Sequence, residues 1–148
     1  MVQTVGTITA SVVNPQVQPS SHLYNGSPNR LFMVLDENGG LMVHTGETLE
    51  GDHRKFNGII LRVASVIIDG QLHTYALENP NTSYWGYEPG VGVRTYWVTT
   101  GSITCSLNQS AEMKGTFHFE AAFEGKEVKI SNGVVNLSGY ASVADLEF

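Results

Sequence analysis

Cysteine, charge and long apolar runs are all scarce in this chain of 148 residues. The single cysteine, Cys105, has no partner for an intrachain disulfide, so no disulfide framework holds the fold. Charged residues make up 15% of the sequence, with 8 basic side chains against 14 acidic ones and a formal net charge of -6. Because phosphate binding draws on clustered lysine and arginine, this balance argues against a nucleic-acid partner.

No apolar run approaches the roughly 18 residues that a membrane-spanning helix needs. The chain does not open with a basic segment followed by an apolar one, as a signal peptide would. We therefore expect one soluble domain over residues 1–148, without a membrane-spanning segment. A cytoplasmic location stays open at this point, and so does export with removal of a leader.

Motifs of catalysis and cofactor binding are also missing. The chain has no Gly-x-Ser-x-Gly elbow, no His-Glu-x-x-His zinc motif, no phosphate loop and no dinucleotide fingerprint. Its five histidines never stand at ligand spacing from one another or from Cys105. Residues 36–40 contain closely spaced oxygen ligands but lack the spacing of an EF-hand, which favours a hairpin turn. We expect no catalytic residue, no metal and no cofactor.

Alternating apolar residues dominate residues 101–137. A period of two places these side chains, Cys105 among them, on one face of a strand and His118 on the other. Turn-forming residues interrupt the alternation in three places, at 108–110, 124–126 and 132–133. We therefore predict a meander of half-buried antiparallel strands, with Cys105 as a small core residue and His118 in solvent.

Similar patterns occur upstream. Residues rich in β-branched and apolar side chains predict a first strand and a hairpin, at 4–13 and at 31–35 with 41–44. Segments without a period, rich in proline, glycine or polar residues, predict loops at 14–29, 45–58 and 78–93. A short helical turn is an alternative for the second of these segments.

The longest apolar run spans residues 59–68 and favours a strand buried on both faces over an amphipathic helix, because Val and Ile dominate it. Residues 72–77 follow across Asp69-Gly70 and should complete a second hairpin with it. Residues 94–100 resume strand character before the meander, and residues 140–148 could add a last strand. Together these patterns predict an all-β fold, a single antiparallel β-sandwich or flattened barrel of about eight to ten strands with little helix.

Aromatic residues gather in and just after the expected loop at 78–93, namely Tyr84, Trp85, Tyr87, Tyr96 and Trp97. Tyrosine and tryptophan on a loop rich in glycine and proline can offer flat apolar faces to a sugar ring or a protein partner while their polar tips stay hydrated. Alternatively, the rings fold back over an open end of the sandwich. The exposure of Trp85 and Tyr87 distinguishes these two interpretations.

The C-terminal third contains GSIT at 101–104, MKGTFHFEA at 113–121 and VKISNGVVN at 128–136. These segments resemble the closing signature of a domain-of-unknown-function family of small bacterial envelope proteins, often lipoproteins, whose chains end in strands like GTFSFTA and ITNGKF. HTYAL at 73–77 is similar to the GTYTL segment of that family. The resemblance implies an all-β sandwich in a cell envelope or secreted setting, and it implies no catalytic residues.

The sequence thus favours a non-enzymatic binding or structural module of the bacterial envelope or exterior, with the five aromatic residues as its contact surface for a glycan or a protein. A lipocalin-like carrier, whose closed barrel would enclose a small hydrophobic ligand, is the alternative from another class. A hydrolase that uses scattered Asp, Glu and His side chains is a third possibility.

Overall fold

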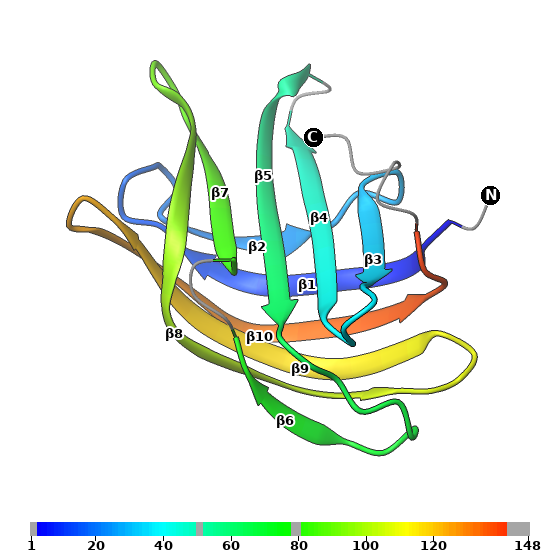
Figure 1. Ribbon diagram of the computed structural model, residues 1–148. Helices are drawn as coiled ribbons and strands as arrows, with labels where there is room; N and C mark the ends of the chain where they lie inside the picture. Colours follow the sequence, from blue (N-terminus) through cyan, green and yellow to red (C-terminus); the bar gives the residue numbers. More distant parts are fainter. Residues whose placement is uncertain (1–2, 50–51, 78–80, 142–148) are drawn as a thin grey trace.

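The computed structural model describes residues 3–49, 52–77 and 81–141 (Figure 1). Within these ranges the chain forms ten strands and no helix: β1 (Val5–Val13), β2 (Ser21–Asn25), β3 (Leu31–Leu35), β4 (Leu41–Leu49), β5 (Asp52–Val63), β6 (His73–Ala76), β7 (Ser83–Glu88), β8 (Gly92–Leu107), β9 (Glu112–Phe123) and β10 (Lys126–Ser138). No helix in this part of the chain is long and apolar enough to cross a membrane.

All strand pairs are antiparallel, in the order β2-β1-β10-β9-β8-β7-β5-β4-β3, with β6 attached to β8. Figure 1 shows this sheet folded over itself, so that β3, β4 and β5 run across β1, β10 and β9. The long strand β8 belongs to both halves, and its pairing with β9 shifts register between Val98 and Thr100. The sheet is not closed into a barrel, since β2 and β3 are its two ends. The predicted all-β class and flattened-sandwich architecture are confirmed.

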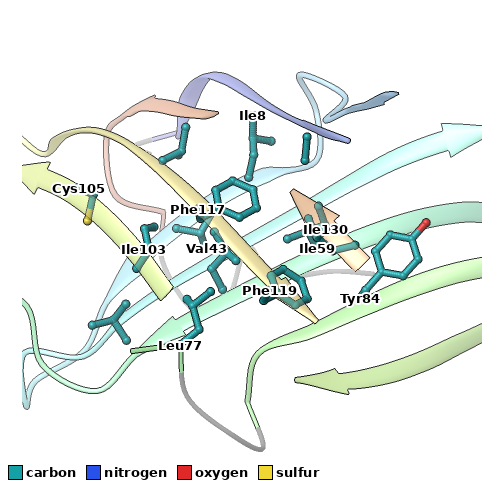
Figure 2. Close-up of a cluster of buried hydrophobic side chains, with 14 of the residues drawn as sticks. Ile8, Val43, Ile59, Leu77, Tyr84, Ile103, Cys105, Phe117, Phe119 and Ile130 are labelled. Atoms are coloured by element: carbon teal, nitrogen blue, oxygen red, sulfur yellow. The ribbon is translucent and has the colours of Figure 1, made fainter. Parts of the chain in front are cut away.

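The core lies between the two halves of the sheet and follows from the alternation along the strands. In β9, Met113, Phe117 and Phe119 point inward and are buried, while His118 is exposed, as predicted. Figure 2 shows these phenylalanines among aliphatic side chains from both halves of the sheet, including Ile8, Val43, Ile59, Ile103 and Ile130. Cys105 is buried in the same cluster, and burial raises the pKa of its thiol to about 11, which confirms it as a core residue.

Three segments predicted as loops contain strand, and those predictions are wrong. Strand β2 lies within 14–29, where it pairs with β1. Strands β4 and β5 extend into 45–58 from its two ends, and β7 lies within 78–93. The apolar period of a strand is absent from 45–58, because polar residues, Thr45 and Asn57, occupy buried positions there. Hydrogen bonds replace the apolar contacts of these two side chains. In β7, Gly86 suggested a loop to sequence reasoning. The structure needs glycine there for packing, because a Cβ would come within 2.8 Å of the Tyr84 ring.

The run at 59–68 is strand as far as Val63, but the prediction of burial on both faces is wrong. Ile59, Leu61 and Val63 are buried, whereas the residues between them are half-buried. The predicted hairpin across Asp69-Gly70 is also wrong, because β6 pairs with β8. Strand β5 ends at Val63, and residues 64–72 carry no strand before β6, so β5 and β6 do not meet across a tight turn.

The expected turn at Asn132-Gly133 is a bulge inside the continuous strand β10. The pairing of β10 with β9 shifts register between Ile130 and Gly133, and Asn132 adopts a φ of 51°. A Cβ on Gly133 would lie 2.6 Å from the Phe117 ring, so the bulge lets this ring pack against bare backbone. Residue types that suit a tight turn suit a bulge equally well.

The first strand and the hairpin of β3 and β4 are confirmed, and so is the turn between β3 and β4. Asp36 Oδ1 accepts hydrogen bonds from the backbone N–H groups of Asn38 and Gly40, both at 2.8 Å. The other oxygen, Oδ2, lies 3.0 Å from Arg62 Nη2. These bonds account for the acidic residue at this turn. The last strand expected at 140–148 falls largely outside the described residues.

Candidate binding cleft

The five aromatic residues lie in strands β7 and β8 and do not form one surface. Tyr84 and Tyr96 face the core and are each 1% exposed, whereas Trp97 is 45% exposed on the outer side of β8. Trp85 and Tyr87 are half-buried at positions that alternate with Tyr84, and Trp85 lies on the same outer face as Trp97, because Trp97 is opposite Ser83. Alternation along two paired strands therefore separates residues that are close in sequence.

Trp85 packs against the outer side of the sheet. Its ring stacks on Phe56 of β5 at a centroid distance of 6.3 Å, and its indole N–H donates to Ser83 Oγ at 2.9 Å. The guanidinium of Arg30 lies over the same Phe56 ring at 5.1 Å. Trp85 thus has packing and hydrogen-bond partners of its own.

A cleft opens where β7 separates from β5. The two strands pair only from Ile60 opposite Ser83 to Gly58 opposite Trp85. Beyond this point β5 continues with β4, and β7 continues with β8, so the two hairpin ends diverge toward the top of Figure 1. The side chain of Asn57 bridges the gap, because its Oδ1 accepts the backbone N–H of Tyr87 at 3.0 Å.

The cleft has a volume of about 310 Å³ and is lined from both halves of the sheet. Its walls include Val17 and Pro19 from the segment after β1, and Tyr84 and Tyr87 from β7. Polar side chains from two further strands complete the lining, among them His22 of β2 and Lys55 and Asn57 of β5. We call this hollow the end cleft.

The segment after β1 is held in place by its own side chains. Asn14 Oδ1 accepts from the backbone N–H and from the side-chain amide of Gln16, at 3.1 and 2.9 Å. The same Gln16 amide reaches the carbonyl of Glu127 on β10 at 3.1 Å. The wall that this segment contributes to the end cleft is therefore anchored to the sheet.

A carboxylate organises the polar side of the end cleft. Glu47 Oε1 accepts from Asn57 Nδ2 at 2.9 Å and lies 3.2 Å from His22 Nε2, while Oε2 accepts the backbone N–H of Asn25 at 2.9 Å. Burial alone would raise the pKa of Glu47, but the hydrogen bonds from His22, Asn57 and Asn25 outweigh it and hold this pKa below its ordinary value. An ionised Glu47 thus orients both His22 and Asn57.

Buried tyrosines form the boundary between the aliphatic core and the end cleft. The Tyr24 hydroxyl lies 2.6 Å from Thr45 Oγ1, which donates onward to the carbonyl of Ile59 at 3.3 Å. Burial raises the pKa of Tyr96, and the side chains of Gln16 and Asn14 offset part of this shift.

Tyr84 is the third buried tyrosine at this boundary. Among the residues that the structure describes, its hydroxyl has no hydrogen-bond partner, although the residue is 1% exposed and lines the end cleft. Figure 2 shows this hydroxyl pointing away from the aliphatic cluster. Burial, followed by the charge of Glu47, raises the pKa of Tyr84 far above its ordinary value, so the hydroxyl keeps its proton.

Sequence reasoning found the two tyrosines of the end cleft but missed His22, Glu47 and Asn57. These three residues come from segments that were predicted as loops, and 25 positions separate His22 from Glu47. The alternation of buried and half-buried positions along β4 ends at Thr45 and Gly46, which are both buried, so no local period pointed to Glu47. Within the described ranges, no group of three or more His, Cys, Asp or Glu side chains is placed to hold a metal ion.

No protein-family model, curated protein or solved structure matches this chain. The resemblance to the family of small envelope proteins therefore stays a prediction.

Proposed function

We propose that this protein is a non-enzymatic binding module of the bacterial envelope or exterior, and that it takes one ring of a glycan into the end cleft. The end cleft itself is the observation on which the proposal depends. The low charge content and the resemblance of residues 101–136 to envelope proteins support the setting.

The lining of the end cleft suits a sugar ring. A sugar has an apolar face of C–H groups and an edge of hydroxyls, so it needs an aromatic or aliphatic surface beside oriented polar groups. Tyr87, Val17 and Pro19 supply the first, while Asn57 and His22 supply the second. A volume of about 310 Å³ lies at the lower end of the range for small-molecule sites, which suits a single ring.

The polar groups favour binding over catalysis. A general acid or base must be free to exchange a proton with the substrate. Both oxygens of Glu47 are instead engaged by groups of the protein, and its lowered pKa keeps it ionised. The only cysteine, Cys105, lies in the core with a pKa raised to about 11 by burial. Glu47 therefore serves to position Asn57 and His22.

The interior between the two halves of the sheet is less suited to a ligand. A lipocalin-like carrier would enclose its ligand there, but aliphatic and aromatic side chains of the core cluster pack against one another in that space (Figure 2). The end cleft is open to solvent and is lined by polar as well as apolar groups. We therefore place the ligand at the end of the sandwich.

The experiment is a glycan array, followed by NMR titration of the ¹⁵N-labelled protein with the best array ligand. We expect the amide signals of Asn57 and Tyr87 to shift on titration. Tyr87→Ala should weaken binding about fivefold, because an aromatic contact contributes on the order of 1 kcal/mol. Trp97→Ala is the matched control, since Trp97 is exposed on β8 and does not line the end cleft. Absence of any glycan ligand, or equal losses in both variants, would refute the proposal.

A further inference from the structure

We infer that Asn57 is the positioning residue of the end cleft: its side-chain amide sets how far β7 stands from β5, and so holds Tyr87 against one sugar ring. This inference rests on the proposed function and names the residue through which the cleft keeps its width. Asn57 is 7% exposed, and both it and Tyr87 line the end cleft.

The amide of Asn57 takes the place of a backbone group at the point where β5 and β7 part. Pairing of the two strands ends with Gly58 opposite Trp85, and Asn57 is the next residue of β5. The backbone N–H of Tyr87 then donates to Asn57 Oδ1 at 3.0 Å, where a continued ladder would supply a carbonyl of β5. Because this acceptor lies at the end of a side chain, the strands can stand farther apart than the roughly 4.8 Å of a paired ladder.

The orientation of the Asn57 amide is fixed by its partners. Its Nδ2 donates to Glu47 Oε1 at 2.9 Å, and an ionised carboxylate can only accept. A flipped amide would place its oxygen against that carboxylate and its NH₂ group against the N–H of Tyr87. Glu47 is in turn held by His22 and by the backbone N–H of Asn25, at 3.2 and 2.9 Å. One chain of hydrogen bonds therefore ties β7 to β5, β4 and β2.

The place of the Tyr87 ring depends on this chain of bonds. Tyr87 lies two residues beyond the last paired position of β7, which is Trp85. The ammonium of Lys55 also lies 5.9 Å from the centre of the Tyr87 ring. At this distance, and on a flexible stem, the ammonium constrains the ring less than a hydrogen bond to a buried amide does. Loss of the Asn57 amide should therefore move the aromatic wall away from a bound sugar.

The test is a double-mutant cycle on the full chain, with methyl glycosides of glucose, galactose and mannose as probes titrated by NMR. Asn57→Leu should weaken binding of the best probe at least about fivefold, because it removes the same aromatic contact as Tyr87→Ala. The double variant should lose about fivefold less than the product of the two single losses, since that contact is counted only once. Single losses that multiply to within about twofold would show independent roles and overturn the inference.

Asn57→Asp is the variant that should restore the position of Tyr87. The new carboxyl group and Glu47 cannot both ionise at about 3 Å, so one proton is shared between them. The other oxygen of the new carboxyl group can still accept the N–H of Tyr87. Asn57→Asp should therefore recover most of the affinity that Asn57→Leu loses. An Asn57→Asp protein that binds as weakly as Asn57→Leu would contradict the positioning role.

Thr45→Val is the matched control for stability. Thr45 is buried, its hydroxyl donates to the carbonyl of Ile59, and it does not line the end cleft. This variant should lower the thermal midpoint and leave the affinity unchanged. A loss of affinity equal to that of Asn57→Leu would show that lower stability alone weakens binding, against the inference.

The remaining outcomes separate the two proposals. If Tyr87→Ala weakens binding and Asn57→Leu does not, the proposed function stands and this inference is wrong. If no probe and no array glycan binds, both proposals fail.

Discussion

Replacing Glu47 with glutamine should destabilise the folded protein, because a carboxylate can accept three hydrogen bonds where an amide cannot. The three donors are Asn57 Nδ2, His22 Nε2 and the backbone N–H of Asn25. Glutamine has one acceptor oxygen and one NH₂ group. In either orientation of its amide, at least one donor faces an NH₂ group. The remaining hydrogen bonds become weaker, because their acceptor no longer carries a negative charge.

The magnitude follows from the exposure of the partners. A hydrogen bond to a charged group contributes about 1.5–3 kcal/mol and a neutral one about 0.5–1.5 kcal/mol, so each of the two bonds that the amide oxygen keeps loses about 1 kcal/mol with the charge. Asn57 is buried, so the amide oxygen should turn toward it and leave the exposed backbone N–H of Asn25 to water. We therefore expect a loss of about 2 kcal/mol, which corresponds to about 1 M in the urea midpoint when m is about 2 kcal/mol/M.

Urea unfolding at neutral pH measures this loss, and Glu127→Gln is the control. Glu127 is exposed at the start of β10, and its substitution should change stability by less than about 0.5 kcal/mol. A Glu47→Gln protein within about 0.5 kcal/mol of the wild type would show that the carboxylate does not organise this end of the sandwich.

A pH series gives a second check with a definite sign. The pKa of Glu47 is lowered in the folded state, so its ionised form stabilises the fold above the ordinary carboxyl pKa. This stabilisation is lost as the pH falls through the lowered pKa. The difference between the wild type and Glu47→Gln should be full at neutral pH and shrink on acidification. A difference that stayed constant into acid would refute the reasoning.

Further predictions concern the core. Phe119→Ala should cost about 3–5 kcal/mol in urea unfolding, because the ring is 1% exposed, while His118→Ala at the preceding, exposed position should cost less than about 0.5 kcal/mol. Similar losses in both variants would contradict the assigned faces of β9. Cys105 should react with a thiol reagent only on unfolding, because burial raises its pKa to about 11, and rapid labelling of the native protein would contradict its place in the core.

The strands of the C-terminal half could be predicted because their signal is local. Phe117, His118 and Phe119 alternate in polarity at the period of a strand, and each points to the face that the period assigns to it. The bulge at Asn132 could not be predicted. The same residue tolerates a turn and a bulge, and the register with β9 on either side decides between them.

The end cleft could be predicted only in part. Tyr84 and Tyr87 were identified by their type, but the sequence placed them in a loop and grouped them with Trp97, which lies outside the cleft. His22 and Asn57 were missed because their segments are polar strands, in which hydrogen bonds to Glu47 replace apolar contacts. A binary pattern of apolar and polar residues cannot recognise such strands.

By itself, the sequence determined the all-β class and the inward and outward faces of the strands in residues 101–137, because alternation depends only on neighbours along the chain. The tertiary structure decided which strands pair across the fold and where β5 and β7 part. It also decided that the Tyr24 hydroxyl meets Thr45 while Tyr84 lines the end cleft. These outcomes depend on contacts between segments far apart in the chain, and no local pattern encodes them.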